Sequence, residues 1–170
     1  QVCDPVAPIR QTPAPDGPML TQLLFGEGFE LAREVDGWAY GRSTHDGYIG
    51  WVDLSSLSGS VLATTHTVSA LRTYAYSAPS LKAPPHGLLS LNAKLSVEAQ
   101  EGRYLKIARL GWVFEGHVRP RGQHASDPVA LAEAMIGTPY FWGGKETLGL
   151  DCSGLVQIVL EAAGLACLRG

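Results

Sequence analysis

The residues best suited to chemistry form the sequence DCSG at positions 151–154, directly after an aromatic, glycine-rich stretch that begins at Tyr140. An apolar run over residues 155–163 predicts a helix that begins at Cys152 and ends before Gly164. Unpaired N–H groups at a helix N-terminus favour the thiolate form of a cysteine and can also stabilise an oxyanion. Cys152 is therefore a candidate nucleophile. The alternative is that it packs as a small buried side chain, as free cysteines often do.

The other two cysteines lack this setting. Cys167 lies in an apolar tail and is interpreted as structural, whereas Cys3 lies near the first residue and is interpreted as incidental. No Cys-x-x-Cys or paired Cys/His spacing occurs, so we expect neither a metal site nor a cofactor.

The composition is typical of a folded protein, with 45% hydrophobic and 17% charged residues among 170. The net charge is −3 and no run of Lys or Arg occurs, which argues against nucleic acid and anionic membrane surfaces as partners. No apolar run approaches the length of a bilayer span. The compartment stays open between the cytoplasm and the cell envelope.

Residues 1–121 read as short strands separated by turns. The turn signals are strongest at Asp36-Gly37 and Asp46-Gly47, because glycine adopts positive φ without steric cost. The tripeptide Gly50-Trp51-Val52 recurs as Gly111-Trp112-Val113, which indicates an internal repeat. We predict two small β-barrels, at 1–57 and 58–121, and place Pro79, Pro84 and Pro85 in a loop of the second.

Residues 122–170 have a helical period instead, so the predicted fold class is mainly β with a C-terminal α part. Asp127 is a suitable N-cap, Pro128 a first helical residue and Gly137 a terminator. One face of that helix should be apolar, formed by Val129, Ala132, Met135 and Ile136. The helix over 152–163 is apolar almost all round, which predicts a place in the interior.

The pattern Tyr140-x-Trp142-Gly143-Gly144, followed by Asp151-Cys152-Ser153-Gly154-Leu155, resembles the NlpC-type papain-like cell-wall cysteine peptidases. With two preceding SH3-like units, the chain further resembles their γ-D-glutamyl-L-diamino acid endopeptidases. The resemblance implies that 122–170 is the N-terminal helical portion of a papain-like α+β domain. It also implies a bacterial enzyme that hydrolyses the γ-D-glutamyl–diamino acid bond of short murein peptides.

By position, the resemblance makes Cys152 the nucleophile and the Tyr140 hydroxyl a donor on the oxyanion side. Asp151 would bind the terminal ammonium of the substrate, Ser153 its backbone, and Trp142 would line the pocket.

In this subgroup the first SH3-like unit closes one end of the cleft through a glutamate and a tyrosine. Glu27 and Tyr48 are the best matches here. Glu27 as an ordinary turn residue and Tyr48 as part of the barrel core remain open alternatives.

A thiolate peptidase needs a base, and the family supplies a histidine after the cysteine helix. The last residue here is Gly170, so we expect the chain to be an inactive fragment of a longer peptidase. Five histidines precede the helix: His45, His66, His86, His117 and His124. Of these, only His124 and His117 are candidates to approach Cys152. The helix 152–163 would lack its usual cover, which predicts self-association or a partner chain.

Two other functions stay open. The chain could be a non-catalytic module in which paired SH3-like units bind cell-wall peptides or proline-bearing segments. It could also belong to another thiol acyl-transfer enzyme on a papain-like core, such as an amidase or acyltransferase. The double barrel and Asp151 beside the nucleophile favour cleavage of short peptides.

Overall fold

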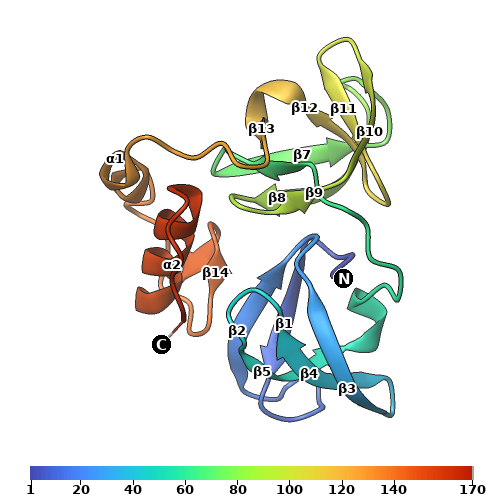
Figure 1. The fold of residues 1–170 in the computed structure, drawn as a ribbon, viewed down its shortest axis with the longest axis vertical. Helices are drawn as coiled ribbons and strands as arrows, with labels where there is room; N and C mark the ends of the chain where they lie inside the picture. Colours follow the sequence, from blue (N-terminus) through green and yellow to red (C-terminus); the bar gives the residue numbers. More distant parts are fainter. Residues whose placement is uncertain (170) are drawn as a thin grey trace.

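Short β-strands make up most of the structure, a computed structural model that describes residues 1–169 (Figure 1). Two five-stranded sheets and a three-stranded sheet precede two helices and a small hairpin. The predicted fold class, mainly β with a C-terminal α part, is confirmed. Within residues 1–169, no helix has the length and apolar character needed to cross a membrane.

The first sheet has the strand order β2-β1-β5-β4-β3. Its strands are β1 (Val6–Arg10), β2 (Met19–Leu24), β3 (Phe29–Val35), β4 (Trp38–Ser43) and β5 (Ile49–Asp53). Asp36 and Gly37 join β3 to β4 with φ of 48° and 80°, the positive values that a tight two-residue hairpin turn requires. Gly47, with φ of 76°, turns the chain between β4 and β5. Both turns predicted from the sequence are present.

The second five-stranded sheet repeats the strand order of the first. Its order is β8-β7-β12-β11-β10, so the two Gly-Trp-Val strands, β5 and β12, hold equivalent places. Its strands are β7 (Arg72–Tyr76), β8 (Pro85–Ser90), β10 (Val97–Glu101), β11 (Tyr104–Ile107) and β12 (Gly111–Phe114). A three-stranded sheet of β13 (Val118–Pro120), β6 (His66–Val68) and β9 (Lys94–Leu95) accompanies it. Two short 3-10 helices, Leu54–Ser56 and Glu115–His117, follow β5 and β12.

The prediction for the prolines is wrong at one position. Pro79 and Pro84 lie outside the strands, but Pro85 opens β8 opposite Tyr76 at a shift in register. β8 is the last strand of its sheet, where a residue without a backbone N–H leaves no ladder bond unmade.

The two units meet where the chain leaves β2. Phe25 is buried in the core of the second unit, and its carbonyl accepts a hydrogen bond of 2.8 Å from the N–H of Lys94. Gly26, with φ of 78°, lies so close to the carbonyl of Lys94 that a β-carbon would overlap it. The first unit therefore contributes a side chain to the core of the second.

Two helices and a hairpin form the C-terminal part. They are α1 (Pro128–Glu133), the hairpin of β14 (Lys145–Glu146) and β15 (Gly149–Leu150), and α2 (Cys152–Ala162). Asp127 caps α1 by accepting a hydrogen bond of 2.9 Å from the N–H of Ala130, as predicted. Figure 1 shows β14 between α2 and β2, so this part packs on the first sheet through the hairpin.

Two expectations about helix burial are wrong. Met135 is buried, but Val129 and Ile136 are 66% and 84% exposed. Ile136 lies beyond the end of α1 at Glu133 and no longer follows its apolar face, whereas Val129 lies within α1 on its exposed side. Helix α2 is not buried all round either. Ile158 is buried in the core, whereas Cys152 and Val156, one turn apart, are exposed.

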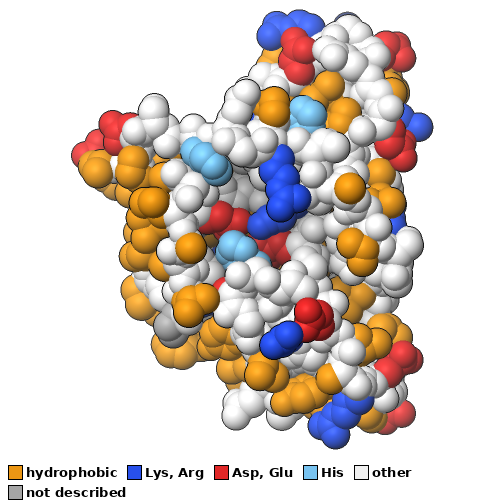
Figure 2. Space-filling view, in the orientation of Figure 1, with side chains coloured by type: hydrophobic (Ala, Val, Ile, Leu, Met, Phe, Trp, Pro, Cys, Tyr) orange, Lys and Arg blue, Asp and Glu red, His pale blue; other side chains and the backbone are white. Residues whose placement is uncertain are grey.

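A cluster of charged side chains lies where the three parts meet. Lys145 Nζ lies 2.8 Å from Glu27, and both side chains are almost fully buried. Lys94 Nζ lies 2.8 Å from Glu161 and 3.8 Å from Glu27, and His45 Nε2 lies 3.3 Å from Glu161. Figure 2 shows both charges gathered in a hollow between the strand units and the helices.

These contacts determine the titration of Glu161. Burial disfavours its carboxylate, but the hydrogen bond with His45 and the ammonium groups of Lys94 and Lys145 outweigh it and lower the pKa of Glu161 from 4.5 to about 2. A carboxyl whose pKa is lower in the folded chain stabilises the fold above its unfolded pKa. That stabilisation is lost as the pH falls towards the folded pKa.

We expect Glu161→Gln to lower the free energy of unfolding by up to about 3 kcal/mol at neutral pH. The difference from the unaltered chain should be constant above pH 4.5 and vanish as the pH falls to about 2. Urea unfolding at a series of pH values measures it. Glu30→Gln, which removes an exposed partner of Arg42, should change stability by less than about 1 kcal/mol. A Glu161→Gln effect equally large at pH 2 and pH 7 would contradict this account.

Candidate active site

Cys152 is the first residue of α2, and its side chain is exposed. It faces a cavity of about 260 Å³ formed by the turn after α1, the loop at Tyr140, strand β15 and the first turn of α2. Met135, Leu150 and Leu155 give the cavity an apolar wall. The backbone N–H of Cys152 has no hydrogen-bond partner within residues 1–169, so it is available to an oxyanion.

Asp151 caps α2 and organises the residues around the thiol. Its Oδ1 accepts hydrogen bonds from the N–H of Gly154, at 2.7 Å, and from the Ser153 hydroxyl, at 3.3 Å. Its Oδ2 accepts from the N–H of Gly143, at 2.9 Å, and from Arg169 Nη2, at 2.6 Å. The carboxylate therefore joins the loop, the helix and the C-terminal tail, and both of its oxygens are occupied.

The aromatic loop presents its side chains outward. Tyr140 is 65% exposed and lines the cavity beside Cys152, while its backbone bridges to Leu150. Trp142 is 71% exposed and is not among the residues that line this cavity. Gly143 has φ of 74° and lies against the backbone of Leu20, an approach that a larger residue would obstruct.

The two residues expected from the first unit do not reach this cavity. Glu27 is buried, and its carboxylate is held by Lys145 and by the N–H of Leu24 at 3.0 Å. Tyr48 is half-buried and packs against the core of the first unit. Of the predicted site residues, the structure brings together Cys152, Asp151, Ser153 and Tyr140 and leaves the other three apart.

The loop that carries Tyr48 is nevertheless tied to α2. Asp46 accepts a hydrogen bond of 2.9 Å from Gln157 on α2, and its other oxygen accepts from the N–H of Tyr48. Burial raises the pKa of Asp46, but hydrogen bonds from Gln157 and Ser43 outweigh it and hold the pKa below its usual value. Asp46 thus stays ionised where the first unit meets the helix.

No histidine lines the cavity beside Cys152 in the described part of the chain. His124 lies against Gly164, beyond the far end of α2, and an 11-residue helix is about 16 Å long. His117 pairs with Thr73 at 2.9 Å in the second unit. The two histidines that were candidates to approach Cys152 therefore lie elsewhere. Of the other three, His45 contacts Glu161, His66 contacts Thr65, and His86 contacts the carbonyl of Leu110.

Sequence reasoning missed three residues that support the site. Arg169 contacts Asp151, Lys145 pairs with Glu27, and Gln22 Oε1 accepts hydrogen bonds from the N–H groups of β14, the shorter at 2.7 Å. Their partners lie between 18 and 124 residues away, so no local pattern could reveal them. The only signal was polar residues within apolar or glycine-rich surroundings.

One cluster has the residue types of a metal site. Ligand atoms of Glu27, His45 and Glu161 lie within 4.8 Å of one another. However, Lys94 and Lys145 already supply positive charge to both carboxylates. The lysines occupy the place that a cation would take.

Comparison with known proteins identifies related segments in this chain. Residues 9–57 match the bacterial dipeptidyl-peptidase SH3 domain, and residues 137–169 match the NlpC/P60 family. The gamma-D-glutamyl-L-lysine dipeptidyl-peptidase of Bacillus subtilis is 28% identical over 163 residues, which are 88% of this chain and 55% of that protein. The chain thus spans about half the length of this relative.

Other relatives match over shorter stretches of this chain. The probable peptidoglycan endopeptidase LytE of Bacillus subtilis is 51% identical over 38 residues, 22% of this chain and 11% of that protein. The crystal structure of an NlpC/P60 family protein from Bacillus cereus superposes with a TM-score of 0.81 at 16% identity. The superposition covers 99% of this chain and 73% of the Bacillus cereus chain, which shows that the two proteins share a fold.

We expect iodoacetamide near neutral pH to alkylate Cys152 at least roughly tenfold faster than Cys3 or Cys167. Cys152 is exposed at a helix N-terminus, whereas the other two thiols are partly covered and contact backbone carbonyls. Peptide mass spectrometry over time gives the three rates. The Cys152→Ser variant should keep only the two slow reactions. Equal rates at all three cysteines would identify Cys152 as a structural residue.

Proposed function

Because residues 137–169 match the NlpC/P60 family and residues 9–57 match the bacterial dipeptidyl-peptidase SH3 domain, we propose that Cys152 is the nucleophile of a peptidoglycan peptidase. One observation carries the proposal. The exposed thiol of Cys152 lies at the N-terminus of α2 and faces a cavity that also contains Asp151 and Tyr140. The names of the relatives in Bacillus subtilis agree with this function.

The reaction is acyl transfer to sulfur. The Cys152 thiolate attacks the scissile carbonyl, and the negative oxygen that forms accepts hydrogen bonds from the N–H of Cys152 and the Tyr140 hydroxyl. The C–N bond then breaks as the amine takes a proton from water, and a second water molecule hydrolyses the thioester to the carboxylic acid and the free thiol. Both donors border the same cavity.

The proposed substrate is a short murein peptide cleaved after γ-D-glutamate. Asp151 is the group in this cavity that can bind the terminal ammonium of such a peptide, and Ser153 lies beside it to contact the backbone. Arg169 now occupies Asp151 Oδ2, so the ammonium has to replace the guanidinium there. Trp142, which is exposed outside this cavity, and Tyr48 are assigned to contacts with the part of the substrate that extends beyond the cavity. Glu27 supports the hairpin beside the cavity through its pair with Lys145.

The general base is the missing component. No imidazole lines the cavity within residues 1–169, so we expect this chain alone to be inactive in hydrolysis. The same observation favours a second candidate function, a non-catalytic module that binds cell-wall peptides. Substrate-directed labelling of the thiol separates the two, because it needs the binding site and the nucleophile but not turnover.

We expect L-Ala-γ-D-Glu chloromethyl ketone to alkylate Cys152 at least roughly tenfold faster than its L-Glu diastereomer, since Asp151 holds the ammonium and fixes the reacting carbon at sulfur. Asp151→Asn should abolish this preference, and Glu30→Gln should not change it. Mass spectrometry of the labelled peptide gives the rates. Hydrolysis of L-Ala-γ-D-Glu-L-Lys should stay undetectable. Equal labelling rates for the two diastereomers would exclude the peptidase and leave the non-catalytic binding module as the candidate function.

We also expect the chain to self-associate through the exposed face of α2. Val156 is 51% exposed, and the neighbouring tail presents Leu168 at 76%. Sedimentation velocity should show a species heavier than a monomer that grows with concentration. Val156→Glu should suppress it, whereas Val61→Glu, at a 77% exposed valine in the connection between the units, should not. A single monomeric species at every concentration would rule out this interface.

A further inference from the structure

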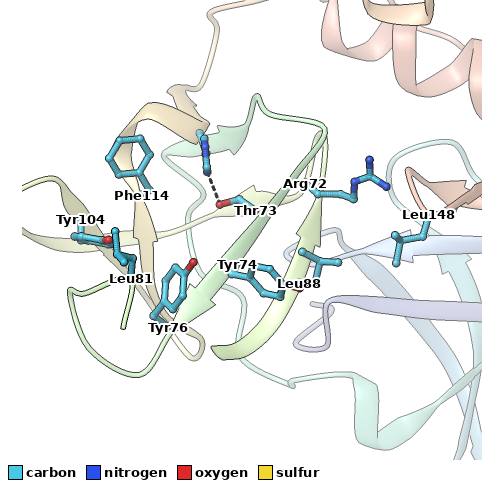
Figure 3. Close-up of a pocket in the computed structure, with 10 residues that line it drawn as sticks. Arg72, Thr73, Tyr74, Tyr76, Leu81, Leu88, Tyr104, Phe114 and Leu148 are labelled. Atoms are coloured by element: carbon cyan, nitrogen blue, oxygen red, sulfur yellow. Dashed lines mark hydrogen bonds between the residues drawn. The ribbon is translucent and has the colours of Figure 1, made fainter. Parts of the chain in front are cut away.

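A second cavity, of about 600 Å³, lies away from Cys152 on the second unit (Figure 3). We call it the tyrosine groove and define it by Arg72, Tyr74, Tyr76, Tyr104, Phe114 and His117. It has more than twice the volume of the cavity beside Cys152, and the proposed hydrolysis uses none of its residues.

The groove follows strand β7. Ala75 is buried in the core of the unit, and Thr73 is buried where its hydroxyl pairs with His117 at the wall of the groove. Arg72, Tyr74 and Tyr76 alternate with these two residues along β7. Alternate residues of a strand are about 6.6 Å apart, the same repeat as alternate side chains of an extended peptide. Figure 3 shows the tyrosines along one line and Arg72 at the end nearest Leu148. The groove therefore has the length and repeat of an extended ligand.

The aromatic rings form notches rather than a flat surface. Tyr74 and Tyr76 have centroids 6.2 Å apart and planes tilted by 52°. Tyr104 meets Tyr76 at 87° and Phe114 at 68°, and Phe114 meets His117 at 75°. A sugar ring stacks best on a flat, open aromatic face, which these crossed rings do not provide. Slots between tilted rings instead accept narrow apolar side chains, as in aromatic-lined peptide grooves.

The polar groups of the groove favour a carboxylate. Arg72 is exposed, and within residues 1–169 its guanidinium donates only to the carbonyl of Thr147, at 3.3 Å. No Asp or Glu lines the groove in the described part of the chain. Within residues 1–169, the hydroxyls of Tyr76 and Tyr104 donate to no protein group, so they are available to a peptide backbone. A guanidinium without an acidic partner matches a free carboxylate.

We propose that the tyrosine groove binds an extended peptide that ends in a free carboxylate, with the carboxylate at Arg72 and apolar side chains between the rings. This goes beyond the proposed hydrolysis, because it assigns a second peptide site. The two sites border one hairpin. Leu148 lines the groove and Leu150, two residues later, lines the cavity beside Cys152.

The test uses the full chain with Cys152→Ala, so that the probe cannot be cleaved. L-Ala-γ-D-Glu-L-Lys-D-Ala and its C-terminal amide differ only at the terminal carboxylate, because both keep the α-carboxylate of D-Glu. They are titrated separately, and amide chemical shifts in NMR spectra give both the affinity and the place of binding. We expect shifts along β7 and β12, and about tenfold weaker binding of the amide form. Arg72→Glu should weaken the acid form by at least roughly tenfold and leave the amide form unchanged.

Arg42→Glu, the same charge change at an exposed arginine of the first unit, is the matched control and should change neither affinity. Tyr74→Ser, at a 49% exposed ring, should weaken both forms alike. Equal affinity for acid and amide, or shifts confined to residues around Cys152, would overturn the proposal. So would N-acetylchitotriose binding along β7 as tightly as the peptide, because that result assigns the groove to a saccharide. Labelling at Cys152 by the chloromethyl ketone is measured separately, so the two proposals fail independently.

Discussion

The buried ion pair between Lys145 and Glu27 is the contact on which the arrangement of this molecule depends. Both side chains are withdrawn from water, so neither charge is tolerable without the other. Removing one member of such a pair typically costs about 3–5 kcal/mol. Lys145 begins the hairpin that ends at Leu150, and Leu150 is a wall of the cavity beside Cys152. The first unit thus positions the cavity without contributing a side chain to it.

Asp151 holds together the residues around the thiol, as the ion pair between Lys145 and Glu27 holds the hairpin to the first unit. One carboxylate caps α2, holds the N–H of Gly143 in the preceding loop and pairs with Arg169. Asp151, beside the proposed nucleophile, therefore has a structural role that does not depend on substrate. In the proposed reaction the substrate ammonium replaces only the guanidinium, and the bonds to Gly154 and Gly143 keep the carboxylate in place.

The repeated units have diverged in what they do. Both have the same strand order, but the first contributes Glu27 and Asp46 to the interface with the helical part, whereas the second carries an open groove. The difference lies in the strand that starts each repeat. The alternate residues of β1, Val6, Pro8 and Arg10, include no aromatic ring, but those of β7 include Tyr74 and Tyr76. Both units thus contact the helical part, and the second also carries the groove.

The sequence by itself determined the features that depend on neighbouring residues. Asp36-Gly37 specified a hairpin, Asp127 and Pro128 specified the start of α1, and the DCSG sequence specified a cysteine at the start of α2. These are local, because a turn or a cap is formed by residues within about four positions of each other. Only the tertiary structure decided that Glu27 is buried against Lys145 and that Arg169 returns to Asp151. It also decided that His124 lies at the wrong end of α2. Burial and charge pairing depend on which distant segments pack together, and no local spacing encodes that.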